Sequence, residues 1–183
     1  IRMRFELVKS NLKVSYYKNL LDGGDKESLS RDLDAELRQV DDDYLFIASC
    51  NEGGEFMAPE KIERVKKIAT RTWERTRKNA NHKLPCIENL LSDKTEHIIE
   101  RQESDKISPD NPWKFKVNVP KYKFNRGEIY NLCIARGTLT EEERFIINAH
   151  MIQTIKMLEE LPFPKHLRNV PEIAGGHHEK MDG

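Results

Sequence analysis

The sequence predicts a mostly α-helical protein, made of several amphipathic helices with one short β-strand or hairpin near residues 113–124. Apolar residues recur every three or four positions through residues 1–73 and again through residues 140–161, which is the spacing of a helix face. Turn-forming stretches rich in glycine, proline or serine separate these runs. Alternation with a period of two is confined to the segment PWKFKVNV, residues 112–119.

Three helices are predicted in the N-terminal part. The first spans residues 1–21, the second follows the turn DGGDKESLS with Ser28 or Ser30 as its cap, and the third begins near Pro59, a residue that the first turn of a helix tolerates. Their expected buried faces are, in order, Ile1, Phe5, Val8, Leu12, Tyr16 and Leu20; then Leu33, Leu37, Val40, Tyr44 and Ile47; then Ile62, Val65, Ile68, Ala69 and Trp73.

Residues 76–112 have weak periodicity, and we expect an irregular connection with short helical pieces near 87–91 and 95–102. The strand that follows is ended by Pro120 or made an edge strand by it. Its lysines alternate with aromatic residues, a pattern that suits single-stranded nucleic acid but is more simply explained by lysines that protect a sheet edge. The run Asp41-Asp42-Asp43 lacks the spacing of a calcium loop and is interpreted as a solvated helix face.

Composition excludes some classes of partner. The 31 basic residues balance the 31 acidic ones, so the chain has no global field that favours a nucleic acid polymer or an anionic membrane. Its longest apolar runs, such as residues 45–48, are far shorter than the roughly 18 residues of a membrane helix. The three widely spaced cysteines, Cys50, Cys86 and Cys133, indicate reduced thiols and a cytoplasmic location. Because the chain opens without methionine or a signal pattern, we expect an internal piece of a longer protein.

The clearest local signal starts at Thr140. Thr140 and Glu143 have the spacing of a capping box, and glutamates in the first turn suit the helix dipole. His150 falls at the edge of the apolar stripe of this helix and is expected to face inward, where a histidine is either a hydrogen-bonded core residue or a metal ligand. The expected stripe is Ile147, Met151, Ile155, Leu158 and Leu161.

A second histidine signal follows in AGGHHEKMDG, residues 174–183. Pro171 suits a helix start, and Gly175-Gly176 removes side-chain bulk so that other groups can approach the backbone. Adjacent imidazoles on a helix diverge by about 100°, so His177 and His178 suit two neighbouring metal ions better than one. Spacing alone leaves metal binding and a polar chain end equally open.

The order of these motifs resembles the second half of an HD-GYP domain, a branch of the HD phosphohydrolase superfamily. The resemblance covers about residues 126–183, and residues 1–125 then form a helical insertion or regulatory segment that packs on the bundle, forms a homodimer seam or transmits a signal. The matching positions are Leu139, Thr140, Glu142, Glu143, His150, His177, His178, Glu179, Asp182 and Gly183.

The resemblance implies an HD-type helical bundle with two or three divalent metal ions, iron or manganese being favoured, and hydrolysis of the bacterial signalling molecule cyclic di-GMP by metal-activated water. It assigns His150, His177 and His178 as metal ligands, with Glu179 and Asp182 orienting them. The chain lacks the His-Asp dyad and the Gly-Tyr-Pro motif of the family, so we expect this piece alone to be inactive. Another nucleotide or phosphoester substrate, or a degenerate non-catalytic signalling module, remains as an alternative.

Overall fold

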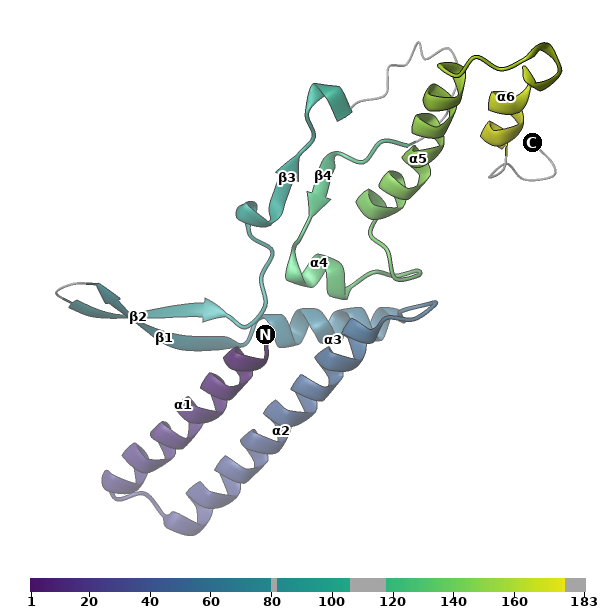
Figure 1. The fold of residues 1–183 in the computed structure, drawn as a ribbon. Helices are drawn as coiled ribbons and strands as arrows, with labels where there is room; N and C mark the ends of the chain where they lie inside the picture. The colour runs from purple at the N-terminus through teal and green to yellow at the C-terminus, as the bar shows by residue number, and fades with distance from the viewer. Residues whose placement is uncertain (80–81, 106–117, 177–183) are drawn as a thin grey trace. The chain divides into compact units, whose positions relative to one another are not determined.

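The computed structural model describes residues 1–79, 82–105 and 118–176, which contain six α-helices and two pairs of β-strands (Figure 1). The predicted mostly helical fold is therefore confirmed. The chain divides into two compact units: the first comprises residues 1–98 and 125–138, and the second comprises residues 99–124 and 139–183. None of the helices in the described ranges is long and apolar enough to cross a lipid bilayer.

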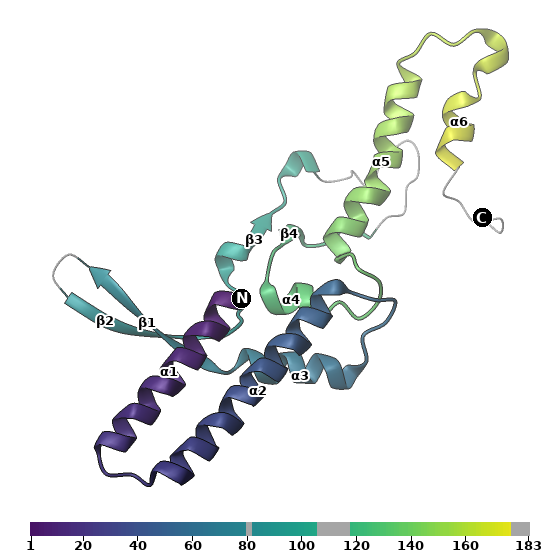
Figure 2. The same ribbon diagram turned by 60° about the horizontal axis from the view of Figure 1, so that its bottom comes forward.

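The first unit is built on a pair of helices, α1 (Arg2–Leu21) and α2 (Lys26–Glu52), which lie side by side (Figures 1 and 2). Phe5 and Val8 of α1 are buried with Val40 and Ile47 of α2, as the periodicity predicted. The ring of Phe5 meets the ring of Tyr44 edge to face, with 5.4 Å between the centroids, a favourable aromatic geometry.

The cap of α2 differs from the prediction. The helix begins at Lys26, and the carboxylate of Asp25 accepts a hydrogen bond of 2.9 Å from the backbone N–H of Ser28. Neither Ser28 nor Ser30 is the cap, because both lie inside the helix. The N–H of Ser28 is itself one of the first-turn donors that a cap must satisfy. Aspartate and serine are comparably good caps, so the sequence alone did not decide between them.

Helix α3 (Pro59–Ala69) starts with proline in its first turn, as expected, and buries Val65, Ile68 and Ala69. Trp73 was predicted on this helix but lies in the strand β1 (Thr72–Asn79), where its indole N–H donates to the carbonyl of Asn89 at 3.2 Å. Because α3 ends at Ala69, the residues after it are free to extend into a strand.

The expectation of an irregular connection over residues 76–112 is wrong at its beginning. β1 pairs with β2 (His82–Asn89) in an antiparallel ladder that runs from Thr72 opposite Asn89 to Asn79 opposite His82. Most of these positions are polar, so no clean alternation marked the strands. Pairing of the two backbones, which local periodicity does not report, stabilises them.

Short elements follow: β3 (Ile98–Glu100) with the 3₁₀ turns Thr95–His97 and Glu103–Asp105 on either side, then β4 (Tyr122–Asn125), which pairs with β3, and α4 (Glu128–Leu132). β4 lies at the end of the segment predicted to contain a strand, whereas residues 113–117 of that segment lie outside the described residues. The ammonium of Lys123 in β4 pairs with Asp105 at 3.0 Å.

Helix α4 is held in the first unit by two carboxylates. Glu128 makes a two-pronged ion pair with Arg4 of α1, with N–O distances of 2.7 and 2.8 Å, and also accepts from the N–H of Ser92 at 3.1 Å. Asp93 accepts from the N–H of Ile129 at 2.8 Å and thereby satisfies a donor of the first turn. These contacts join α1 and α4, which are far apart in the sequence.

The acidic run of α2 is only partly a solvated face. Asp43 is 8% exposed, and its carboxylate accepts from the amide of Gln39 at 3.0 Å and lies 3.6 Å from guanidinium nitrogens of both Arg64 and Arg71. Asp42 is exposed and pairs with Arg64 at 2.5 Å. The expectation of a solvated run is therefore wrong for Asp43, because two arginines from outside α2 converge on it.

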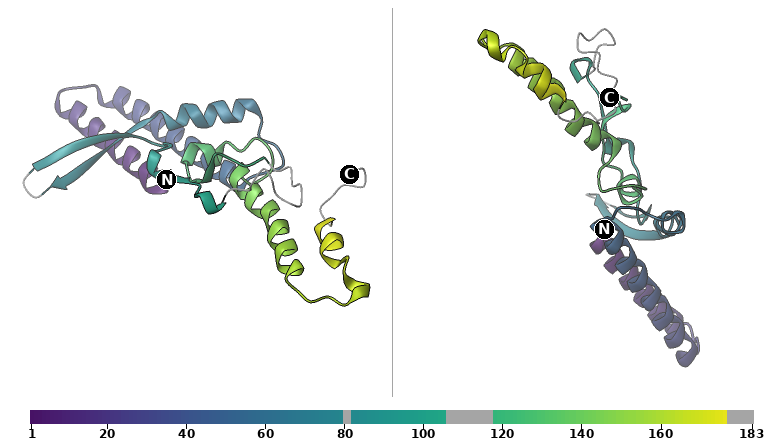
Figure 3. Two further views of the ribbon diagram at one scale, coloured as in Figure 1. Left: turned by 90° about the horizontal axis from the view of Figure 1, so that it is seen from above. Right: turned by 90° about the vertical axis from the view of Figure 1, so that its right-hand side faces the viewer.

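The second unit contains α5 (Glu141–Glu159), a 3₁₀ turn at Lys165–Leu167 and α6 (Val170–Gly175), with Pro171 in the first turn of α6 as predicted. The two helices lie side by side (Figure 3). Of the predicted stripe of α5, Met151 and Ile155 are buried, whereas Ile147 and Leu161 are exposed. Phe145 and Ile152 are buried instead, so the buried face is rotated from the predicted one.

Candidate functional site

The start of α5 forms the predicted capping box. The hydroxyl of Thr140 accepts from the N–H of Glu143 at 3.2 Å, and the carboxylate of Glu143 accepts from the N–H of Thr140 at 2.9 Å. Two backbone donors are thereby satisfied reciprocally, and Thr140 is buried. The helix that carries His150 consequently has a well-defined first turn.

Glu142, one of the positions that match the family motif, is a buried acidic residue, and its burial was not predicted from the sequence. Its side chain is only 5% exposed, although a glutamate in the first turn of a helix is ordinarily solvated. It precedes the buried Phe145 by three residues, so both lie on one side of α5, and this spacing is the signal that would have found it. The helix dipole favours a carboxylate at this position.

His150 lies in the middle of α5 and is exposed, so the expectation that it faces inward is wrong within the described part of the chain. Its ring nitrogen Nδ1 contacts the backbone carbonyl of Ile147, one turn earlier. A carbonyl oxygen only accepts hydrogen bonds, so this contact suits an imidazole protonated at Nδ1. A histidine protonated at that nitrogen can present Nε2 to a metal ion.

The surroundings of His150 on α5 are partly apolar. Helical spacing places it on the side of α5 that carries the exposed Ile146 and Met157, together with the polar Gln153 and Thr154. The sequence offered apolar residues on more than one side of α5, and packing selected the side of Phe145, Ile152 and Ile155 as the buried one. Periodicity alone therefore misjudged which side faces inward.

Helix α6 approaches α5 on another side. A Cβ added to Gly175 would lie 2.8 Å from Cδ1 of Ile155, so the missing side chain lets Ile155 approach the backbone closely, as the sequence predicted. His150 and Ile155 are five residues apart and project about 140° from each other around the helix. The described end of α6 thus contacts α5 away from His150.

The remaining predicted site residues, His177, His178, Glu179 and Asp182, lie outside the described residues. Within residues 1–79, 82–105 and 118–176, no group of three histidine, cysteine, aspartate or glutamate side chains is placed to hold a metal ion. A metal ion bound in the expected way needs at least three such donors. His150 and its described neighbours therefore do not fit a metal by themselves, and the predicted ligand set depends on His177 and His178.

Two cysteines of the first unit, Cys50 and Cys133, do not have the properties of nucleophiles. Burial raises the pKa of the Cys50 thiol and of the Cys133 thiol. A raised pKa keeps a thiol protonated, whereas a nucleophilic cysteine needs a lowered one. The chemistry expected of the protein is thus not thiol chemistry at these two residues.

A hollow of about 470 Å³ lies beside the first half of α5. Phe145 forms part of its wall, and the guanidinium of Arg101 lies 4.4 Å from the centroid of that ring, held by the carbonyls of Pro120 and Tyr122. Asn148 also lines this hollow. It is two residues before His150, a rotation of about 200° around the helix axis, so the two side chains lie on nearly opposite sides of α5. This hollow and the predicted histidine ligand therefore occupy different sides of α5.

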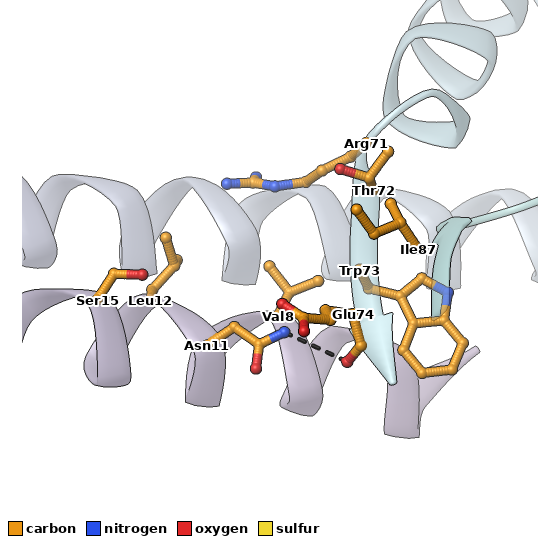
Figure 4. Close-up of a pocket in the computed structure, with 9 residues that line it drawn as sticks. All are labelled: Val8, Asn11, Leu12, Ser15, Arg71, Thr72, Trp73, Glu74 and Ile87. Atoms are coloured by element: carbon orange, nitrogen blue, oxygen red, sulfur yellow. Dashed lines mark hydrogen bonds between the residues drawn. The ribbon is translucent and has the colours of Figure 1, made fainter. Parts of the chain in front are cut away.

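A smaller hollow of about 240 Å³ lies in the first unit between α1 and the strands β1 and β2 (Figure 4). Val8, Leu12 and Trp73 supply apolar wall, and the amide of Asn11 donates to the backbone carbonyl of Glu74 at 3.4 Å. It contains none of the predicted site residues. Its lining lacks the clustered acids, bases or metal ligands that catalysis requires.

Comparison with known proteins identifies the family. The family model described as HD domain matches residues 85–183, which include the motif-bearing residues 126–183 and extend further toward the N-terminus. No curated protein and no solved structure matches the chain significantly. Because the family match covers just over half of the chain, this protein belongs to the HD-domain family, whose members are in general metal-dependent phosphohydrolases.

Proposed function

We propose that the full-length protein is an HD-GYP-type phosphodiesterase that hydrolyses cyclic di-GMP in bacterial signal transduction. The observation that carries the proposal is the order of motifs inside the HD-domain match: a capping box at Thr140, His150 on the same helix, then His177-His178-Glu179 and Asp182-Gly183. Multi-part spacing of this kind is more specific than any single pair of histidines.

Two features of the described structure support His150 as a ligand. The contact of its Nδ1 with the carbonyl of Ile147 suits the tautomer that ligates a metal through Nε2. Its side of α5 also carries the exposed apolar residues Ile146 and Met157, which suit the interior of a helical bundle. His177 and His178 would complete the set, with Glu179 and Asp182 orienting the imidazoles.

The metals, if bound by this set, supply one part of the chemistry: clustered divalent cations lower the pKa of water and neutralise charge on phosphoryl oxygens. Histidine-rich ligation favours iron or manganese over magnesium, which prefers oxygen ligands. The contribution of the chain itself is to present imidazole nitrogens to the metal, and the contact of His150 Nδ1 with the carbonyl of Ile147 would orient one of these rings.

The test uses the full-length protein with three separate substitutions, His150→Ala, His177→Ala and His178→Ala, and measures metal content and turnover of cyclic di-GMP. Each is expected to lower both by more than about tenfold, since even residues that only orient ligands have effects of that size. His166→Ala is the matched control, because His166 is an exposed histidine of the second unit outside the motif.

Undiminished metal content and rate in the three variants would remove the ligand assignment. Hydrolysis of a different nucleotide or phosphoester, with cyclic di-GMP left intact, would favour the wider HD phosphohydrolase function. A protein that binds cyclic di-GMP without turnover or metal would be a degenerate signalling module. The three outcomes are separated by assaying metal, binding and hydrolysis on one preparation.

A further inference from the structure

Helix α1 carries a second apolar face on the side away from its buried residues. Five large apolar side chains of this one helix are between 38% and 87% exposed within the described structure: Met3, Leu7, Val14, Tyr17 and Leu21. Contiguous exposed apolar surface of this kind marks an interaction site more often than scattered single residues do. We call these five residues, together with Ser10, the outer face of α1.

The outer face has the spacing of a coiled coil. Its six residues follow one another at steps of four, three, four, three and four, which is the alternation of a heptad repeat with a mean of about 3.5 residues. At about 100° per residue they fall within an arc of about 80°. Only Ser10 interrupts the apolar series, and it too is exposed.

The outer face lies opposite the face that packs on α2. Phe5, Val8 and Leu12 pack into the core of the first unit, and their mean direction is about 180° from that of the outer face. A partner bound to the outer face would leave the packing of α1 against α2 undisturbed. α1 is therefore apolar on two sides, as expected of a helix with partners on both.

Helix α2 has no comparable stripe. Its exposed positions between Arg31 and Asp42 are mostly charged, and the exposed Leu45 stands by itself. The second apolar face is consequently a property of α1 and not of the helical pair in general. This contrast supplies an internal control for the experiment below.

We propose that the outer face of α1 pairs with the same face of a second copy of this chain as a two-stranded coiled coil. A heptad stripe stays aligned along a supercoil with an identical stripe, so it fits a second copy better than an irregular groove of another protein. The exposed positions that flank the stripe include Glu6, Lys13 and Lys18, which is the polar rim expected beside such a seam. This proposal is independent of the proposed catalytic function.

The seam runs from Met3 to Leu21, about 27 Å of helix. It is short for a coiled coil, so we expect a reversible dimer whose population depends on concentration. The mass of the purified chain is measured by sedimentation equilibrium over two decades of concentration. Dimers are expected at the upper end, and a monomer throughout would overturn the proposal, because the face would then belong to another partner or to none.

The first variant, Val14→Lys with Leu21→Lys, places charges in the seam and is expected to weaken dimerisation more than about tenfold, since burying each of these side chains contributes more than about 1.4 kcal/mol. Both residues are exposed, so the helical far-UV circular dichroism should be unchanged. Leu45→Lys is the matched control: Leu45 is 66% exposed on α2, outside the stripe. A dimer that survives the first variant, or that dissociates equally in the control, would contradict the seam.

A second variant tests the seam in the opposite direction. Ser10→Leu fills the one polar position of the outer face and is expected to tighten the dimer, an effect that misfolding does not produce. Lys13→Leu, at an exposed position beside the stripe, is its control and is expected to have a smaller effect. Failure of Ser10→Leu to tighten the dimer would count against the proposal even if the first variant dissociated.

Discussion

Neighbouring residues of the same type have different roles in the acidic run of α2. Asp42 is exposed, and the Asp41 side chain pairs with Lys9 at 2.9 Å, whereas Asp43 is buried between Gln39, Arg64 and Arg71. Exposed ion pairs contribute little to stability, while a buried carboxylate needs all of its partners. The three aspartates are adjacent and of the same type, so their sequence context does not explain the difference. Asp43 differs because α3 and the residues after it pack against that position of α2.

Glu128 should make the stability of the first unit depend on pH. Burial alone would raise the pKa of Glu128, but hydrogen bonds from Arg4 and the N–H of Ser92 outweigh it and hold that pKa below its ordinary value. The stabilisation is therefore complete above the pKa of the unfolded state and is lost as the pH falls through the lower, folded pKa. Glu128→Gln is expected to destabilise the protein by about 1–3 kcal/mol at neutral pH.

Urea unfolding across a pH series measures this effect. The difference between the native protein and Glu128→Gln should be constant near neutral pH and shrink below about pH 4, where carboxylates of the unfolded chain protonate. Glu6→Gln is a suitable control, because Glu6 pairs with Lys9 on the surface and is 54% exposed. An equal loss in both variants, or a difference that grows in acid, would contradict the assigned role of Glu128.

At the scale of elements, helix starts with a strong local signal were predicted correctly. Thr140 caps α5, Pro59 begins α3 and Pro171 lies in the first turn of α6. Each signal acts within a single turn, so tertiary packing has little opportunity to override it. The strands β1 and β2 were missed because their stability comes from pairing between segments.

Loss of the capping box should destabilise α5. Thr140→Ala removes the hydroxyl that accepts from the N–H of Glu143, and the expected cost is about 1 kcal/mol. Thr140→Ser retains the hydroxyl and is expected to recover most of that stability. The measurement is the midpoint of urea unfolding followed by circular dichroism, and equal midpoints for the Ala and Ser variants would show that the hydroxyl is not what stabilises the helix.

The whole molecule consists of two compact units, and each has its own stabilising contacts. The pair between Arg4 and Glu128 lies within the first unit, and the capping box of α5 lies within the second. Compact units of this kind commonly open as separate cooperative units. Local changes in stability should therefore stay within the unit that carries the substitution.

Hydrogen exchange followed by mass spectrometry tests this independence. Glu128→Gln is expected to speed exchange in α1 and α4 without changing α5, and Thr140→Ala is expected to do the reverse. Each variant serves as the control for the other. Faster exchange in both units from either substitution would mean that the chain opens as one cooperative unit.

The sequence by itself determined the mostly helical fold, the bounds of α1, the start of α3 at Pro59, the capped start of α5 and the motif order that points to the HD-domain family. The interactions behind these features operate within one or two helical turns, so residue spacing records them. The assignment of His177 and His178 as ligands, with His150, stays a prediction from that motif order.

Tertiary structure decided which apolar side of each helix is buried. It turned Phe145 and Ile152 inward and left Ile147 and His150 exposed, and it exposed the outer face of α1 although both of its sides are apolar. The spacing of apolar residues shows that a helix has an apolar face, but that face is buried only if a second element packs against it. The identity of that partner is a property of the assembled chain, because it depends on contacts between residues far apart in the sequence.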